Sequence, residues 1–167
     1  MASSAEAPSP ARLLTAWRLV PQQRSDAAFD GEGARLYGGR WNSPGHAAVY
    51  LADSRALAAL ETLVHSSPES QKTAYVLFEV SFAADLVTEI DIRPLREALR
   101  SPTILPETRR AGDAWLAGGR SPLLRVASAI IPEEINYLLN PAHPEFPLIE
   151  IGAARQFAFD PRLLQGA

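Results

Sequence analysis

At 167 residues, with 47% hydrophobic and 21% charged side chains, the chain has the length and composition of one soluble globular domain. Its net charge of −3 argues against a nucleic-acid binder, which usually carries a clear basic excess. The absence of cysteine excludes disulfides and thiolate metal sites, and it suits a reducing cytosol.

The N-terminal segment does not have the pattern of a signal peptide, because no basic region followed by an apolar core is present. No apolar run reaches the roughly 18 to 20 residues that span a bilayer. We therefore expect a cytoplasmic protein with no membrane association. Residues 1–12 are small and polar with two prolines, which predicts a disordered tail, and residues 13–167 are predicted to form a single domain.

The first half of the domain alternates between clear elements and an irregular stretch. Thr15–Val20 alternates in hydropathy and is stopped by Pro21, which predicts a strand. Residues 21–45 are rich in Gly, Asp, Ser and Arg without periodicity, and such a long irregular stretch is usually functional. Ala47–Leu51 is predicted to be a buried strand. Asp53 or Ser54 can cap a following helix that ends near His65.

The second half contains more strands than helices. The predicted strands are 73–82, 86–92, 123–131, 148–151 and 155–159, and the predicted helical segments are 94–100, 107–116 and a turn over 132–139. No regular βαβ alternation is present. The pattern therefore predicts an α+β fold, with a mixed or antiparallel β core flanked by helices.

Residues 37–61 bring together the residue types of an anion-binding and catalytic site. Gly38 and Gly39 leave the backbone bare beside Arg40, whose guanidinium fork suits a pyrophosphate. The alternative is a turn with an arginine that points to solvent. Trp41 stacks on a base or packs in the core, and the core role is favoured.

Glu61 is the candidate catalytic carboxylate. On a helix it falls at the border of the apolar stripe that Leu57, Leu60 and Val64 define. A carboxylate there has to be paired, hydrogen-bonded or facing a cleft. The alternative is a glutamate at the rim that faces water.

Three further polar residues are candidates for the site. Tyr50 is an edge tyrosine, or it stacks on a nicotinamide or a sugar. Ser128 lies inside a hydrophobic run without a Gly-x-Ser-x-Gly motif, so it is not predicted to be a hydrolase nucleophile. Asn136 lies in a segment rich in turn-forming residues. The three histidines have no metal-ligand spacing, and no metal site is expected.

Taken in order, several short motifs resemble the RES domain, which is named for its arginine, glutamate and serine. The resemblance runs from Trp17 to Phe159. It rests on Trp17-Arg18, Gly38-Gly39-Arg40-Trp41-Asn42, Tyr50, Glu61, Gly112-Asp113-Ala114-Trp115, the segment 126–130 and the segment 134–143. Ala127 departs from the pattern, because the family often has proline before the serine.

This resemblance implies a fold, an activity and a partner. The fold is similar to that of ADP-ribosyltransferases, and the activity is cleavage of NAD+ at the nicotinamide–ribose bond with water or phosphate as acceptor. The protein would be the toxin of a bacterial type II toxin–antitoxin pair that arrests growth. Its partner would be an Xre-like helix-turn-helix antitoxin, in an oligomeric complex without direct nucleic-acid contact. NAD+ would be the substrate, with no other cofactor.

The resemblance also implies roles for individual residues. Arg40, Tyr50, Glu61 and Ser128 would form the catalytic site, with Arg40 and Tyr50 also binding NAD+. Arg18, Trp41 and Asn136 are expected to contribute to NAD+ binding. Two alternatives stay open: a mono-ADP-ribosyltransferase that modifies a protein at the same site, and a module that binds a nucleotide without catalysis.

Overall fold

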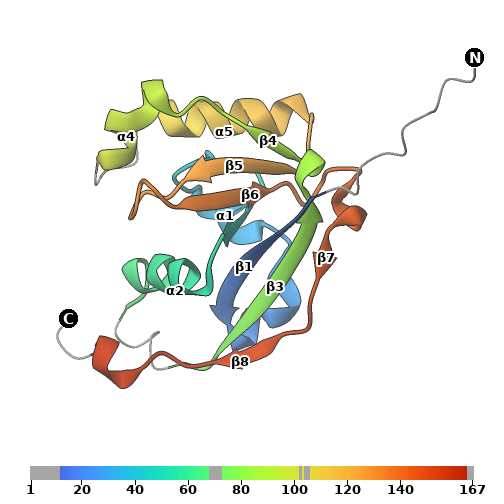
Figure 1. Cartoon of the computed structure of the whole chain (residues 1–167). Helices are drawn as coiled ribbons and strands as arrows, with labels where there is room; N and C mark the ends of the chain where they lie inside the picture. The colour runs from blue at the N-terminus through green and yellow to red at the C-terminus, as the bar shows by residue number, and fades with distance from the viewer. Residues whose placement is uncertain (1–11, 68–72, 102, 104–105, 165–167) are drawn as a thin grey trace, which may run out of the picture.

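A computed structural model describes residues 12–67, 73–101, 103 and 106–164. In these residues eight strands form one sheet in the order β4-β5-β6-β2-β1-β3-β7, with β8 also paired to β3 (Figure 1). The strands are β1 (Leu13–Pro21), β2 (Val49–Ala52), β3 (Tyr75–Ala83), β4 (Val87–Glu89), β5 (Leu123–Ala127), β6 (Ile135–Leu139), β7 (Glu150–Ile151) and β8 (Arg155–Phe157). The pair β4–β5 is parallel and the others are antiparallel, which confirms the expected mixed α+β architecture.

Helices cover the sheet and connect its strands. The α-helices are α1 (Glu32–Tyr37), α2 (Arg55–Val64), α4 (Arg96–Arg100) and α5 (Pro106–Gly118). The short 3-10 helices are η1 (Gln22–Ala27), η2 (Ala84–Leu86), η3 (Arg93–Leu95), η4 (Phe146–Leu148) and η5 (Pro161–Leu164). None of the helices in the described ranges is both long and apolar enough to cross a bilayer.

The sheet is divided where β1 meets β2. β1 pairs with β3 along its whole length, from Leu13↔Ala83 to Pro21↔Tyr75, but its register with β2 is a single pair, Trp17↔Ala52. Strands β5 and β6 therefore run in a different direction from β1 and β3, as Figure 1 shows. The two parts of the sheet diverge on either side of this pair, and the divergence leaves room for side chains between β1 and β2.

Helices pack on one face of both parts of the sheet. α2 buries Leu57 and Ala58 against Trp17 and Ala52. The other part is covered by α4 and α5, where Leu99 and Trp115 pack with Leu124 and Leu138. Since Ala52 and Leu138 project from the same side of the β2–β6 pair, the helices share one face.

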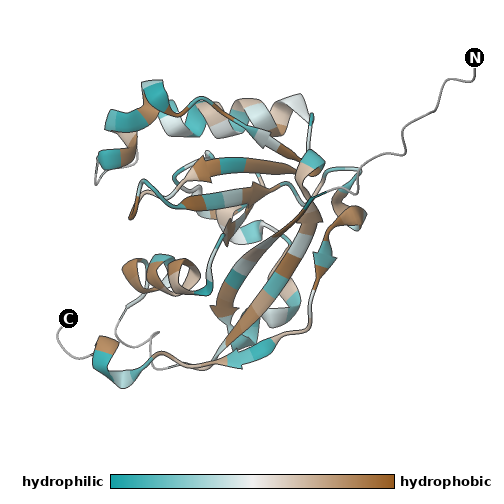
Figure 2. Ribbon diagram, viewed as in Figure 1, coloured by the Kyte–Doolittle hydropathy of each residue, from teal (hydrophilic) through white to brown (hydrophobic). Residues whose placement is uncertain are grey.

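The opposite face carries a separate apolar cluster that includes Ala16, Val49, Leu51, Val80 and Leu139. Hydrophilic residues interrupt the hydrophobic stretches of β1 and β3 (Figure 2), and Tyr75–Phe78 of β3 are all buried.

Several expectations from the sequence are confirmed. The structure contains the strands predicted at 15–20, 47–51 and 73–82, and α5 where residues 107–116 predicted a helix. α2 begins after Ser54, whose side chain accepts a hydrogen bond from Leu57 N at 3.0 Å, so the predicted cap is present. The predicted tail over 1–12 lies outside the described residues, except for Arg12.

Three predictions are wrong in detail. The helical turn predicted over 132–139 is instead β6, because Ile135–Leu139 is hydrogen-bonded to a strand on each side. Residues 21–45, predicted to be irregular, contain η1 and α1. Val64 is 58% exposed and is therefore not part of the apolar stripe of α2, in which Leu57 and Ala58 are buried and Ala59 and Leu63 are partly buried.

Candidate active site

The Glu61 carboxylate is held by two side chains from the other part of the chain. Its Oε1 accepts hydrogen bonds from Ser128 Oγ at 2.8 Å and from Asn136 Nδ2 at 2.6 Å. No hydrogen bond to its Oε2 is recorded within the described residues. One oxygen is therefore fixed by the protein, and the other is available to a ligand.

Ser128 is positioned by the turn that follows β5, and Asn136 is positioned by β6. Ser128 directly follows β5, is fully buried, and accepts hydrogen bonds at its Oγ from Ile130 N and Ile131 N, both at 3.1 Å. These two donors leave the Ser128 hydroxyl proton to point at Glu61. Asn136 lies on β6 opposite Ala52, and its buried Oδ1 has no partner within the described structure. The amide is therefore oriented by its single bond to Glu61.

Tyr50 fixes the glycine-rich turn through its hydroxyl. The Tyr50 hydroxyl donates to Asn42 Oδ1 at 2.7 Å and accepts from Trp41 N at 3.0 Å. A Cβ on Gly39 would lie 2.3 Å from the Tyr50 hydroxyl oxygen, so only glycine fits this position. Burial raises the pKa of Tyr50, which keeps the phenol protonated as a donor.

The same turn is tied to α5 by close contacts. Arg109 Nε donates to Gly39 O at 3.0 Å, and Asp113 Oδ1 accepts from Ser43 N at 2.8 Å. A Cβ on Gly112 would lie 1.7 Å from Trp41 O, so α5 approaches the turn to the limit that glycine allows. These contacts explain why the chain carries Gly112 and Asp113 in the motif that resembles the RES domain.

Trp41 requires a correction. Its side chain is 2% exposed and packs with Leu99, Trp115 and Leu138. The ring therefore has no free face for a base. The structure supports the core role and removes Trp41 from the residues expected to bind NAD+.

Arg40 is engaged with the segment between α4 and α5. Its Nη1 donates to Ala98 O at 3.3 Å and to the carbonyl oxygens of Ser101 and Thr103, both at 3.1 Å. These contacts fix the end of α4. The phosphate-binding role expected for Arg40 stays a prediction for its remaining N–H groups.

Arg18 lies beside the divergence between β1 and β2. Its Nε donates to Ala28 O, and its Nη1 donates to Tyr50 O at 2.9 Å, so the guanidinium connects η1 with β2. Burial lowers its pKa to about 10, the nearby Asp30 opposes this effect, and Arg24 adds to it. Arg18 is therefore a largely desolvated cation that nevertheless carries its charge at neutral pH.

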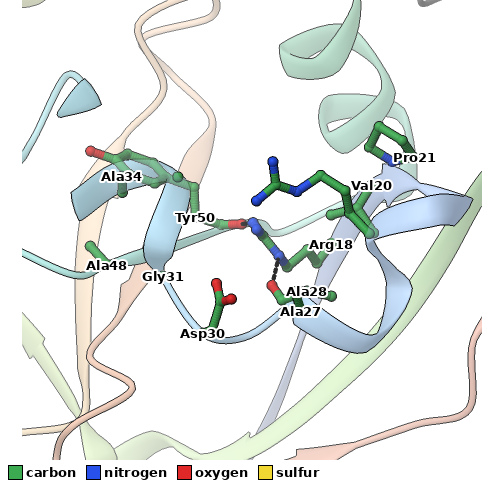
Figure 3. Close-up of a pocket in the computed structure, with 12 residues that line it drawn as sticks. Arg18, Val20, Pro21, Ala27, Ala28, Asp30, Gly31, Ala34, Ala48 and Tyr50 are labelled. Atoms are coloured by element: carbon green, nitrogen blue, oxygen red, sulfur yellow. Dashed lines mark hydrogen bonds between the residues drawn. The ribbon is translucent and has the colours of Figure 1, made fainter. Parts of the chain in front are cut away.

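A cavity of about 250 Å³ adjoins Arg18. Figure 3 shows Arg18, Asp30 and Tyr50 around it, and Arg24 also lines it. No motif in the sequence singles out Arg24 or Asp30. The only signal available was that both fall in the stretch 21–45, which the sequence marks as functional because of its composition.

The predicted residues lie in separate groups, because the lining of the cavity does not include Arg40, Glu61, Ser128 or Asn136. Tyr50 and Arg18 border the cavity, and Glu61, Ser128 and Asn136 form the carboxylate cluster. Tyr50 and Asn136 are diagonal neighbours on one face of the β2–β6 pair, which places them roughly 7–8 Å apart. Arg40 precedes Trp41, whose backbone N–H binds Tyr50, but its Nη1 is directed to the α4–α5 connection.

Sequence comparison places this arrangement in a known family. The model of the RES domain matches residues 15–160, which is most of the chain. The chain belongs to the RES domain family. Its RES domain is 38% identical over 148 residues to "Toxin Res" of Yersinia enterocolitica, a match that covers 88% of this chain and 97% of the relative.

Two further comparisons agree with this assignment. A protein of Sphingobium named "Prs ADP-ribosylating toxin" is 36% identical over 156 residues, covering 90% of this chain and 97% of the relative. Among solved structures, the Mycobacterium tuberculosis MbcT-MbcA toxin-antitoxin complex contains a chain that matches with a TM-score of 0.69 at 21% identity, covering 93% of this chain and 88% of that one. The two chains therefore share the same mixed α+β fold.

Proposed function

We propose that this RES domain is the toxin of a bacterial toxin–antitoxin system and that it cleaves NAD+ at the nicotinamide–ribose bond. The names of the relatives support the toxin role and an activity on NAD+. The observation that carries the chemical proposal is the Glu61 carboxylate, with Oε1 held by Ser128 and Asn136 and Oε2 left for a ligand.

Cleavage of the nicotinamide–ribose bond requires little from the protein beyond stabilisation of the developing charge. As the bond between ribose C1′ and the nicotinamide nitrogen breaks, its electron pair leaves with neutral nicotinamide, which needs no proton. The ribose passes through an oxocarbenium-like state, whose positive charge a nearby carboxylate stabilises. Glu61 Oε2 would supply that charge and accept a hydrogen bond from a ribose hydroxyl. Water would then add to C1′ and lose a proton, or phosphate would add in its place.

Each supporting residue has a defined part in this proposal. Ser128 and Asn136 orient Glu61, so that Oε2 stays directed toward the substrate. The Tyr50 side chain would lie against the nicotinamide side of NAD+, whereas its backbone carbonyl accepts a hydrogen bond from Arg18 at the cavity. Arg40 would hold the end of α4 beside the site, with its free N–H groups toward the phosphates.

The direct test is to incubate the purified protein with NAD+ and measure free nicotinamide. We expect turnover by the unmodified protein and a loss of at least about 100-fold in Glu61→Gln, because the variant keeps the shape of the side chain without its charge. Glu107→Gln is the matched control, since Glu107 is exposed at the start of α5 and forms only a surface ion pair with Arg110. Equal rates for Glu61→Gln and the unmodified protein would exclude Glu61 as the catalytic carboxylate.

A second candidate activity is transfer of ADP-ribose to a protein, and the name of the Sphingobium relative favours it. The same site would serve, with a protein side chain as acceptor in place of water. NAD+ labelled in its adenylate part distinguishes the two activities. Label on a protein band indicates transfer, whereas label only in free ADP-ribose or ADP-ribose phosphate indicates hydrolysis or phosphorolysis.

We also propose an antitoxin as the protein partner, of the Xre-like helix-turn-helix type that the family resemblance implies. The related fold in the MbcT-MbcA toxin-antitoxin complex supports a partner of this general kind. Expression of this chain alone should arrest bacterial growth and lower cellular NAD+, and co-expression with the antitoxin should prevent both. Normal growth with abundant folded protein would count against the toxin role.

A further inference from the structure

The cavity beside Arg18 has walls made of small residues. Alanines and glycines contribute half of its lining, and among them Gly31 has φ 70° and an ideal Cβ position only 2.9 Å from Ala48 N. Its volume of about 250 Å³ is below the roughly 300–1,000 Å³ of pockets that enclose a whole drug-sized ligand. The cavity therefore suits one polar group of a larger ligand, or a small ion.

The Arg18 guanidinium is fixed before any ligand arrives. Two of its nitrogens donate to Ala28 O and Tyr50 O, and its Cζ lies 5.9 Å from the centroid of the Phe29 ring. Its Nη2 has no recorded partner among the described residues. A planar donor held in this way loses little side-chain entropy on binding an anion.

The charges that line the cavity do not balance. Arg18 and Arg24 contribute two positive charges and Asp30 one negative charge. Asp30 Oδ1 is already bonded to Glu32 N at 2.8 Å, at the start of α1. Arg24 is exposed and has no hydrogen bond or ion pair recorded within the described ranges. Two cations that face one cavity repel each other, and an anion between them would remove that repulsion.

We propose that this cavity binds a phosphate group, and that Arg24 and Arg18 are its ligands. Arginine is the side chain best suited to this task, because its N–H groups match two phosphate oxygens. Arg18 would be the fixed donor, and Arg24, on the exposed turn of η1, would close on the anion from the solvent side.

This proposal rests on the proposed function for the origin of the phosphate, and two sources share the same chemistry. The phosphate belongs to the diphosphate of NAD+, or it is inorganic phosphate that serves as the acceptor. In the first case the cavity contributes to substrate affinity. In the second it selects phosphorolysis over hydrolysis.

Calorimetry on a catalytically inactive protein measures the site without turnover. The Glu61→Gln background is titrated with pyrophosphate and, separately, with inorganic phosphate. Arg24→Gln should weaken binding of at least one of these anions by about 10-fold, the loss expected for one charge-assisted hydrogen bond.

A second variant adds a side chain at the wall of the cavity while the charges stay in place. Gly33 lines the cavity on α1, and a Cβ there would meet nothing within 4 Å. Leucine also favours a helix over glycine, so Gly33→Leu should fold and should weaken anion binding by about 10-fold or more. Arg110→Gln, on the exposed surface of α5, is the control and should bind both anions normally.

Kinetic measurements on the active protein, which retains Glu61, then identify the source of the phosphate. If the diphosphate of NAD+ occupies the cavity, Arg24→Gln raises KM for NAD+ and leaves KM for nicotinamide riboside, which has no phosphate, unchanged. If free phosphate occupies it, the variant raises the phosphate concentration needed for phosphorolysis and leaves hydrolysis unchanged.

The outcomes separate this proposal from the proposed function. If the protein shows no NAD+ turnover but binds anions in a way that depends on Arg24, the phosphate site is supported and the proposed cleavage of NAD+ is refuted. If the protein cleaves NAD+ but neither Arg24→Gln nor Gly33→Leu alters anion binding, the phosphate site is refuted and the proposed cleavage of NAD+ is supported. No binding of either anion at millimolar concentration to the Glu61→Gln protein would also overturn the phosphate site.

Discussion

Removing the Tyr50 hydroxyl should destabilise the protein, because that oxygen is the link between β2 and the glycine-rich turn. Tyr50→Phe keeps the ring and deletes two hydrogen bonds, to Asn42 Oδ1 and from Trp41 N. Asn42 is fully buried, so its oxygen would lose its partner where water has little access. An unsatisfied buried polar group costs about 1–3 kcal/mol.

For the two groups together we expect a loss of about 2–4 kcal/mol in the free energy of unfolding. In a chain of this length such a loss lowers Tm by about 5–15 °C, which differential scanning calorimetry measures directly. Tyr37→Phe is the matched control, because Tyr37 is 78% exposed and should change Tm by less than about 2 °C. If both variants melt at the same temperature as the unmodified protein, the Tyr50 hydroxyl does not hold the turn.

Three further predictions concern pH, packing and Arg40. Because burial raises the pKa of Tyr50, its phenol ionises at a lower pH in the unfolded state than in the folded state. The free energy of unfolding should therefore fall as pH rises above about 10. Alkaline unfolding measures this fall, which should be smaller in Tyr50→Phe. Gly112→Ala should lower the free energy of unfolding by about 3 kcal/mol or more, because its Cβ would overlap Trp41 O, and a denaturant titration measures this loss. Gly118→Ala is the control: a Cβ there has open space, so the change should be neutral or slightly stabilising. Arg40→Ala removes the contacts that Arg40 Nη1 makes with the carbonyls of Ala98, Ser101 and Thr103, so amide exchange in α4 should accelerate while α2 is unchanged. Equal protection of α4 in both proteins would show that Arg40 does not fix that helix.

The sequence by itself determined the features that depend on short stretches of chain. The alternation of Thr15–Val20 predicted β1, and the polar Ser54 before an apolar run predicted the start of α2. The position of Glu61 at the border of the helix stripe followed from the helical period, although Val64 proved to be exposed. The ordered motifs were sufficient for the family resemblance.

Only the tertiary structure decided which side chains meet. Glu61 binds Ser128 and Asn136, which are 67 and 75 residues away, because the order and register of β5, β6 and β2 bring them beneath α2. Arg40 was expected to face a phosphate, yet its Nη1 bonds to carbonyls 58 to 63 residues further along the chain. Ile135–Leu139 became a strand because pairing with β2 and β5 outweighed the local preference for a helical turn. Hydropathy patterns and caps act over a few residues, whereas the contacts of these side chains depend on strand pairing across the whole domain.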